Sequence, residues 1–130
     1  MTWVEVFAVF VVCHMVGDYL LQTDWQANNK RGGLGANRES QRALASHILT
    51  YTLAYVPAFV WLAGDIGAML IPVVALVAVP HWIQDDGRLL TLYIQKVKGM
   101  EAAANKSVAA AADQSFHFVV LLLTAMLAAS

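Results

Sequence analysis

The sequence predicts an all-α fold, a four-helix transmembrane bundle, from three observations. Hydrophobic residues make up 59% of the 130 residues and charged residues only 13%, about half the share usual in a soluble protein. Four apolar segments each come close to the ~20 residues that a membrane-spanning helix needs. All eight lysines and arginines lie in or beside two polar connections between these segments. A chain of this length accounts for one domain.

We expect the four helices at about residues 2–23, 42–63, 67–93 and 109–130, within a single membrane domain spanning residues 1–130. Only the short stretch AGDIG separates the second helix from the third, so these two should form an antiparallel hairpin. The other connections are longer and polar, DWQANNKRGGLGANRESQ and QKVKGMEAAANKS. We interpret KRGGLG as a flexible basic loop, with contact to an anionic headgroup as the alternative.

The distribution of basic residues predicts the orientation in the membrane. By the positive-inside rule, both long connections are cytoplasmic and both termini lie outside, in a multi-pass protein of the cell's inner (plasma) membrane. The N-terminus lacks the basic region of a signal peptide. The basic residues are sparse and are not interleaved with aromatic residues, which excludes a nucleic-acid partner. Cys13 is the only cysteine, which excludes a disulfide framework and a CxxC metal site.

Each expected helix carries one histidine, and three of the four histidines have an aspartate four residues away. The histidines are His14, His47, His81 and His117, and the aspartates are Asp18, Asp85 and Asp113. A spacing of four places each pair on one face of a helix. The order is reversed in the fourth helix, where the chain direction also reverses, so each aspartate lies on the cytoplasmic side of its histidine. At ~1.5 Å per residue, these side chains form two thin layers roughly 6–15 Å from the cytoplasmic helix ends.

Ionisable groups at this depth are costly when they face lipid, so they should face the interior of the bundle. Several buried carboxylates need positive charge nearby, from a bound metal, a protonated histidine, or Arg42 or Arg88. Oxygen and nitrogen donors suit zinc, manganese or iron. We therefore predict that one or two divalent ions are held by His14, Asp18, His47, His81, Asp85, Asp113 and His117. Gln22, Thr50 and Tyr51 are weaker candidates for supporting hydrogen bonds.

Four segments resemble an uncharacterised bacterial and phage membrane-protein family catalogued as domain of unknown function 3307. They are HMVGDYLLQTDW, ALASHILTYTL, HWIQDDGRL and DQSFHFVVLLL, and they cover all four expected helices. The resemblance implies a small polytopic membrane protein and carries no activity with it. The His/Asp pattern is also similar in style to membrane-bound metal-dependent hydrolases, which is an analogy of pattern alone.

The pattern favours metal-dependent hydrolysis of a lipid-like or phosphorylated substrate at the cytoplasmic face of the lipid bilayer. The ion would lower the pKa of bound water, and Asp86 would act as the base. Two alternatives stay open: a subunit of a metal-ion or proton transporter or channel, and a non-catalytic membrane scaffold or phage accessory protein. An enzyme needs a cleft at one leaflet, whereas a transporter needs polar groups up to the outer face. Glu5 is the only acid near the outer end of the first helix. Homo-oligomer formation is left open by the sequence.

Overall fold

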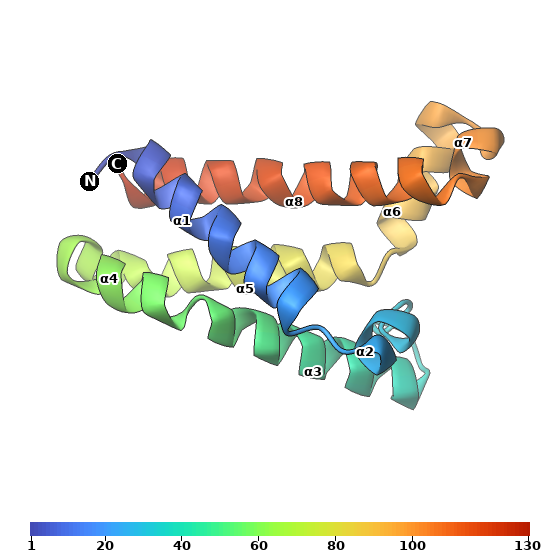
Figure 1. Cartoon of the computed structure of the whole chain (residues 1–130), viewed down its shortest axis with the longest axis horizontal. Helices are drawn as coiled ribbons and strands as arrows, with labels where there is room; N and C mark the ends of the chain where they lie inside the picture. The colour runs from blue at the N-terminus through green and yellow to red at the C-terminus, as the bar shows by residue number, and fades with distance from the viewer.

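The computed structural model describes residues 1–130, and it is all-α without strands. Four longer helices, α1, α3, α5 and α8, pack against one another, and α4 continues α3 (Figure 1). The short helices α2, α6 and α7 lie at the end opposite the two termini, which are close together (Figure 1). The helices are α1 Trp3–Met15, α2 Asp24–Asn29, α3 Arg38–Ala54, α4 Val56–Ile66, α5 Leu70–Asp85, α6 Arg88–Tyr93, α7 Met100–Ala104 and α8 Lys106–Ala128.

Side-chain caps begin three of the four longer helices, α1, α3 and α8. The Thr2 hydroxyl accepts from the Glu5 backbone N–H (3.3 Å), and the Glu5 carboxylate accepts from the Thr2 N–H (2.7 Å). This reciprocal capping box satisfies two backbone donors at the start of α1. The side chains of Asn37 and Asn105 cap α3 and α8 in a similar way. Glu5 is thus engaged at its own helix end.

The helix boundaries differ from the expected ranges at two interruptions. Tyr55 separates α3 from α4, because the following Pro57 has no N–H to donate to the preceding turn. Helix α5 ends at Asp85, and Gly87, seven residues after Pro80, has a φ of +75° that favours glycine. From there α6 leaves in a new direction (Figure 1). The expected helix over 67–93 is therefore divided into α5 and α6, and the polar connections contain α2 and α7.

A π-helical turn over Val16–Leu20 follows α1 and packs closely against α3. The Leu21 N–H donates to the Val16 carbonyl (2.9 Å), five residues back. A Cβ on Gly17 would lie 2.6 Å from Cδ2 of the Tyr51 ring and 3.2 Å from the Tyr51 Cα. Glycine thus permits this close approach, and the extra residue in the turn places the neighbouring Asp18 in the interior. π-turns of this kind are often found at functional sites.

The apolar core fills the half of the molecule that contains the termini. Its members come from α1, α3, α4, α5 and α8, and Tyr55 lies between α3 and α4. The chain reverses at Gly67, where φ is +53°, and α5 packs back against α4 as the expected hairpin (Figure 1). Apart from its tyrosines, the largest fully buried side chains of this core are Val6, Phe10, Leu62, Val73 and Val77.

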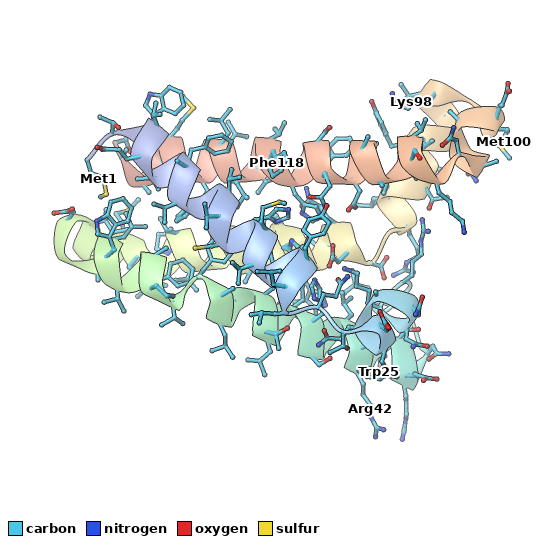
Figure 2. The ribbon with its side chains drawn as sticks, viewed as in Figure 1. Met1, Trp25, Arg42, Lys98, Met100 and Phe118 are labelled. Carbon is cyan, nitrogen blue, oxygen red and sulfur yellow. The ribbon has the colours of Figure 1, made fainter.

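Three stretches are long and apolar enough to cross a membrane: Trp3–Leu20, Val56–Asp85, which contains the Gly67 reversal, and Lys106–Ala128. Helix α3 is not among them: it has 17 residues, and its first turns carry Arg38, Glu39 and Arg42. Large apolar side chains cover the outside, with Leu20 77% and Ile71 76% exposed, whereas all four histidines are buried. An outer surface with this many large apolar side chains, together with buried ionisable groups, is consistent with membrane association. Arg42 and Lys98 point outward at the end opposite Met1 (Figure 2).

Candidate metal centre

The structure brings all seven predicted ligands together, where α1, α3, α5 and α8 meet. They form three overlapping groups, and within each group one donor atom per residue lies within 4.8 Å of the others. All seven are buried except Asp113, whose side chain is 28% exposed. The groups are His14, His81 and His117; Asp18, His47, His81 and Asp85; and Asp85, Asp113 and His117.

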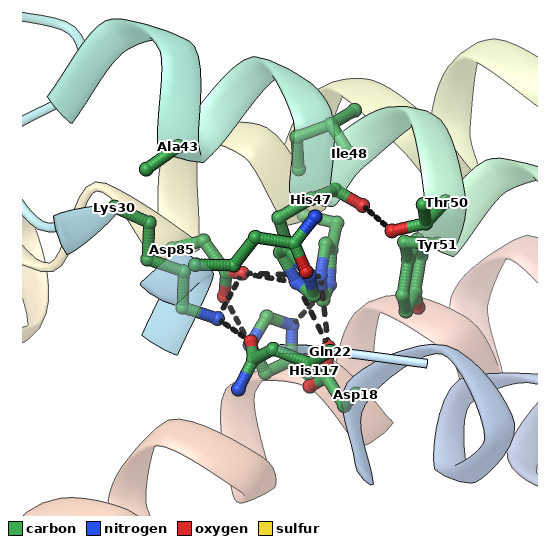
Figure 3. A network of polar contacts seen from close by, with 12 residues as sticks. Asp18, Gln22, Lys30, Ala43, His47, Ile48, Thr50, Tyr51, Asp85 and His117 are labelled. Carbon is green, nitrogen blue, oxygen red and sulfur yellow. Dashed lines mark hydrogen bonds and ion pairs between the residues drawn. The ribbon is translucent and has the colours of Figure 1, made fainter. Parts of the chain in front are cut away.

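The second group has the geometry of a small cage (Figure 3). His47 Nε2 lies 3.2 Å from Asp18 Oδ1 and 2.8 Å from Asp85 Oδ2. His81 Nε2 lies 3.2 Å and 3.3 Å from the same two oxygens, and the two Nε2 atoms are 3.2 Å apart. Zinc ligands about 2.0–2.1 Å from the ion, arranged as a tetrahedron, lie about 3.3 Å from one another. These spacings therefore fit one tetrahedral ion.

Buried atoms without hydrogen-bond partners lie at this centre. Asp18 Oδ1, one of the four cage atoms, is buried and has no partner with hydrogen-bond geometry, although the Nε2 atoms of His47 and His81 both lie 3.2 Å away. A buried carboxylate oxygen without a partner is costly unless a cation meets it. His117 Nε2 and His47 Nδ1 are also buried without a hydrogen-bond partner. The Asp18 oxygen thus needs a positive charge beside it, from a bound cation or from a protonated histidine of the cage.

Lys30 supplies a positive charge that the sequence reasoning missed. Its Nζ donates to Asp85 Oδ2 (2.6 Å) and to Gln22 Oε1 (2.5 Å) (Figure 3). Arg88, considered from the sequence as a partner for these carboxylates, instead pairs with Asp86 (2.6 Å), and Arg42 is exposed. One ammonium against two buried carboxylates leaves a negative charge that a cation or a proton must balance.

A chain of hydrogen bonds extends from the centre into the apolar core. His14 Nδ1 pairs with the Tyr51 hydroxyl (3.0 Å), which pairs with the Tyr55 hydroxyl (2.9 Å). The chain ends where Tyr55 donates to the Phe10 carbonyl (3.0 Å). The Tyr51 ring also stacks on His81, with ring centroids 3.5 Å apart. Tyr51 therefore supports the centre as the sequence suggested, whereas the Thr50 hydroxyl bonds only to backbone carbonyls.

Asp86, the predicted base, belongs to none of the three groups. Its Oδ1 accepts from the Leu34 N–H (2.8 Å), and its Oδ2 accepts from Arg88 Nε (2.6 Å). Burial raises the pKa of Asp86, but Arg88 and the Leu34 amide outweigh it, so the pKa lies below its ordinary value. The KRGGLG loop also donates to the Asp86 backbone through Gly32 (2.9 Å). These contacts hold the loop against the end of α5 and so place Lys30; a role for Asp86 as the base stays a prediction.

A cavity of about 230 Å³ borders the centre on the side of the basic loop. Asp85 and Asp113 form part of its wall, and Lys30, Arg31 and Gln84 form another part. Arg31 is held there by the Thr91 hydroxyl (2.6 Å). The cavity thus joins two carboxylates of the His/Asp groups to two cations, at the end of the molecule opposite the termini.

Comparison with known protein families gives a match. Neither the curated proteins nor the solved structures include a match to this chain. The model of the family described as "Protein of unknown function (DUF3307)" matches residues 6–130. The match includes all four histidines and every segment on which the resemblance was based. The chain therefore belongs to the DUF3307 family of proteins of unknown function.

Proposed function

We propose that the chain is a multi-pass protein of the inner (plasma) membrane that binds a divalent metal ion near the cytoplasmic leaflet. In this proposal it is a four-helix transmembrane bundle with both termini outside. The support is the exposed apolar surface, the buried His/Asp centre, and the basic residues, which belong to segments at the end opposite the termini. Anionic lipids and the positive-inside rule favour that end in the cytoplasm.

The observation that carries the metal proposal is the cage of Asp18, His47, His81 and Asp85. The five edges that involve a histidine nitrogen, 2.8–3.3 Å long, match a tetrahedral set of nitrogen and oxygen ligands. Charge favours the same assignment. Asp18 and Asp85 together carry the two negative charges that a divalent ion needs for neutrality. Zinc, manganese and iron all accept such ligands.

We further propose that the centre hydrolyses a lipid-like substrate that carries an anionic, phosphate-type group. The cavity supports this, because Lys30 and Arg31 line it beside Asp85 and Asp113. The two cations would bind the anionic group, and Asp113, as the most exposed carboxylate of the set, would accept or donate a proton there. A bound divalent ion supplies electrophilic assistance to such a reaction.

The structure gives less support to transport through the same layer. Beyond the Tyr51–Tyr55 hydroxyls, the interior is closed by Val6, Leu62 and Val73, all with 0% exposure. Glu5, which the transport alternative would need, caps its own helix. A non-catalytic scaffold keeps the centre but predicts no turnover, so activity measurements distinguish it from the hydrolase.

Metal content of the purified protein in detergent tests the metal proposal. Wild-type protein should bind one equivalent of zinc, and Asp18→Asn and His81→Ala should lose it. Asp24→Asn is the matched control, since it removes an exposed carboxylate six residues away that belongs to none of the groups. Wild-type protein that binds neither zinc nor manganese, or Asp18→Asn that binds zinc as wild type does, would overturn it.

Hydrolysis is tested with phosphatidic acid in mixed micelles. Zinc-loaded wild-type protein should release inorganic phosphate, and Lys30→Met and Asp18→Asn should release far less. If the protein binds metal but releases no phosphate, the metal proposal stands and the assignment of this substrate class is overturned.

A further inference from the structure

His81 and His117 touch through their Nδ1 atoms, 3.1 Å apart, and both rings are 2% exposed. A neutral imidazole carries one proton, so a ring that binds an ion through Nε2 has its proton on Nδ1. Two Nδ1–H groups that face each other cannot form a hydrogen bond; one of the two atoms must accept. His81 and His117 therefore cannot both be neutral ligands through Nε2 in this arrangement.

The surroundings of the two Nε2 atoms decide which ring binds the ion. His81 Nε2 lies 3.2–3.3 Å from His47 Nε2, Asp18 Oδ1 and Asp85 Oδ2, in the four-atom cage. His117 Nε2 faces only two carboxylate oxygens, Asp85 Oδ1 at 3.3 Å and Asp113 Oδ2 at 3.6 Å. The cage thus places the ligand nitrogen on His81 and the protonated nitrogen on His117.

We propose that His117 is a positioning residue and that the centre holds a single ion bound by two histidines and two aspartates. This inference rests on the proposed metal site. His81 donates from Nδ1 to His117 Nδ1, and the Nε2–H of His117 lies beside Asp85 Oδ1 (3.3 Å) and Asp113 Oδ2 (3.6 Å) as an electrostatic contact without hydrogen-bond geometry. A hydrogen bond such as the one from His81 fixes the tautomer and orientation of a ligand histidine. Because Asp113 lines the cavity, the series of contacts from His81 through His117 to Asp113 connects the ion with the cavity proposed for the substrate.

The same reasoning removes His14 from the ligand set. Its Nδ1 pairs with the Tyr51 hydroxyl (3.0 Å) and its Nε2 with Gln114 Oε1 (2.9 Å), so both nitrogens are engaged. A second ion between Asp85, Asp113 and His117 would need the lone pair of His117 Nε2. The Nδ1 contact with His81 places the proton there, so that group holds no ion while His81 is a ligand.

X-ray absorption of the zinc-loaded, full-length protein counts the imidazole ligands. We expect one zinc per chain with two imidazoles, in wild type and in two variants, His117→Leu and His117→Gln. Zinc affinity should fall about 10- to 100-fold in His117→Leu. It should recover largely in His117→Gln, whose amide keeps an acceptor and a donor. His47→Leu is the ligand control, and its zinc should lose one imidazole.

Nitrogen-15 NMR of the zinc-loaded wild type tests the tautomers without any substitution. His81 should carry its proton on Nδ1 and His117 on Nε2. A spectrum with three imidazoles, the opposite tautomer on His117, or a second zinc that is lost in His117→Leu would overturn this inference and leave the metal proposal standing. Wild-type protein without zinc would overturn both.

Discussion

Replacing Gly17 by alanine should push the π-turn that carries Asp18 away from α3. The new Cβ would lie 2.6 Å from Tyr51 Cδ2, and ordinary contacts begin at 3.4 Å, so the ring must yield by about 0.8 Å. The ring has little freedom to do so, because it stacks on His81 and its hydroxyl pairs with His14. Displacement of either the π-turn or the Tyr51 ring would lengthen the contacts between Asp18 and the other cage residues.

Overpacking of this kind costs typically 1–3 kcal/mol, so about that loss in the free energy of unfolding is expected. Gly64→Ala is the matched control: it lies in α4, has no positive φ, and meets nothing within 4 Å. That change should raise stability by up to about 1 kcal/mol. Unfolding in mixed micelles of a mild detergent and dodecyl sulfate measures both, and zinc titration measures the cage. Gly17→Ala with wild-type stability and wild-type zinc affinity would refute the close approach as the reason for this glycine.

Three further changes test the charges around the centre. Lys30→Met should destabilise the metal-free protein, because the Asp85 carboxylate loses its ammonium at 2.6 Å, and zinc should therefore raise the melting temperature more than in wild type. Asp86→Asn should remove a pH dependence of the free energy of unfolding. The pKa of Asp86 is lowered in the folded state, so the carboxylate stabilises the fold fully above its unfolded pKa of about 3.9. This stabilisation is lost as the pH falls through the folded pKa. The loss should stay below about 1 kcal/mol, since the Arg88 side chain is 59% exposed, and unfolding between pH 2 and 6 measures it. Removing zinc with a chelator should lower wild-type stability by ~2.7 kcal/mol relative to zinc at 100 times its dissociation constant, with no change in Asp18→Asn; equal chelator effects in both would contradict the role of that carboxylate.

The sequence could predict the His/Asp centre because its pairs are local. His14 and Asp18, or His81 and Asp85, share a helix face by spacing alone, and the cost of charge against lipid requires those faces to turn inward. One histidine per helix then suffices to bring the groups into one layer. No knowledge of how the helices are arranged is needed for that conclusion, which is why all seven residues meet in the structure.

Residues outside the regular helices could not be found in this way. Lys30 reaches Asp85 only because the loop after α2 is fastened to Asp86 through the Leu34 and Gly32 amides. Those contacts join residues more than fifty positions apart, and no periodicity records them. The π-turn after α1 is likewise invisible to a spacing rule, because it changes the period on which such a rule depends. Gly17 lies in the π-turn and Gly87 lies where α5 ends. From the sequence alone, a glycine does not show which neighbouring group requires it.

Flux through lipid vesicles separates the hydrolase from the transporter in a single preparation. The hydroxyl chain from His14 ends at the Phe10 carbonyl, and the core beyond it is apolar and fully buried. An ion that crossed there would meet apolar side chains and the Thr124 hydroxyl, which already donates to the Val120 carbonyl (2.8 Å), at a cost of several kcal/mol. We therefore expect reconstituted wild-type protein to pass zinc and protons no faster than Asp18→Asn. A saturable zinc or proton flux that Asp18→Asn abolishes and Asp24→Asn retains would show that the layer is part of a pathway, and the hydrolase proposal would give way to the transporter.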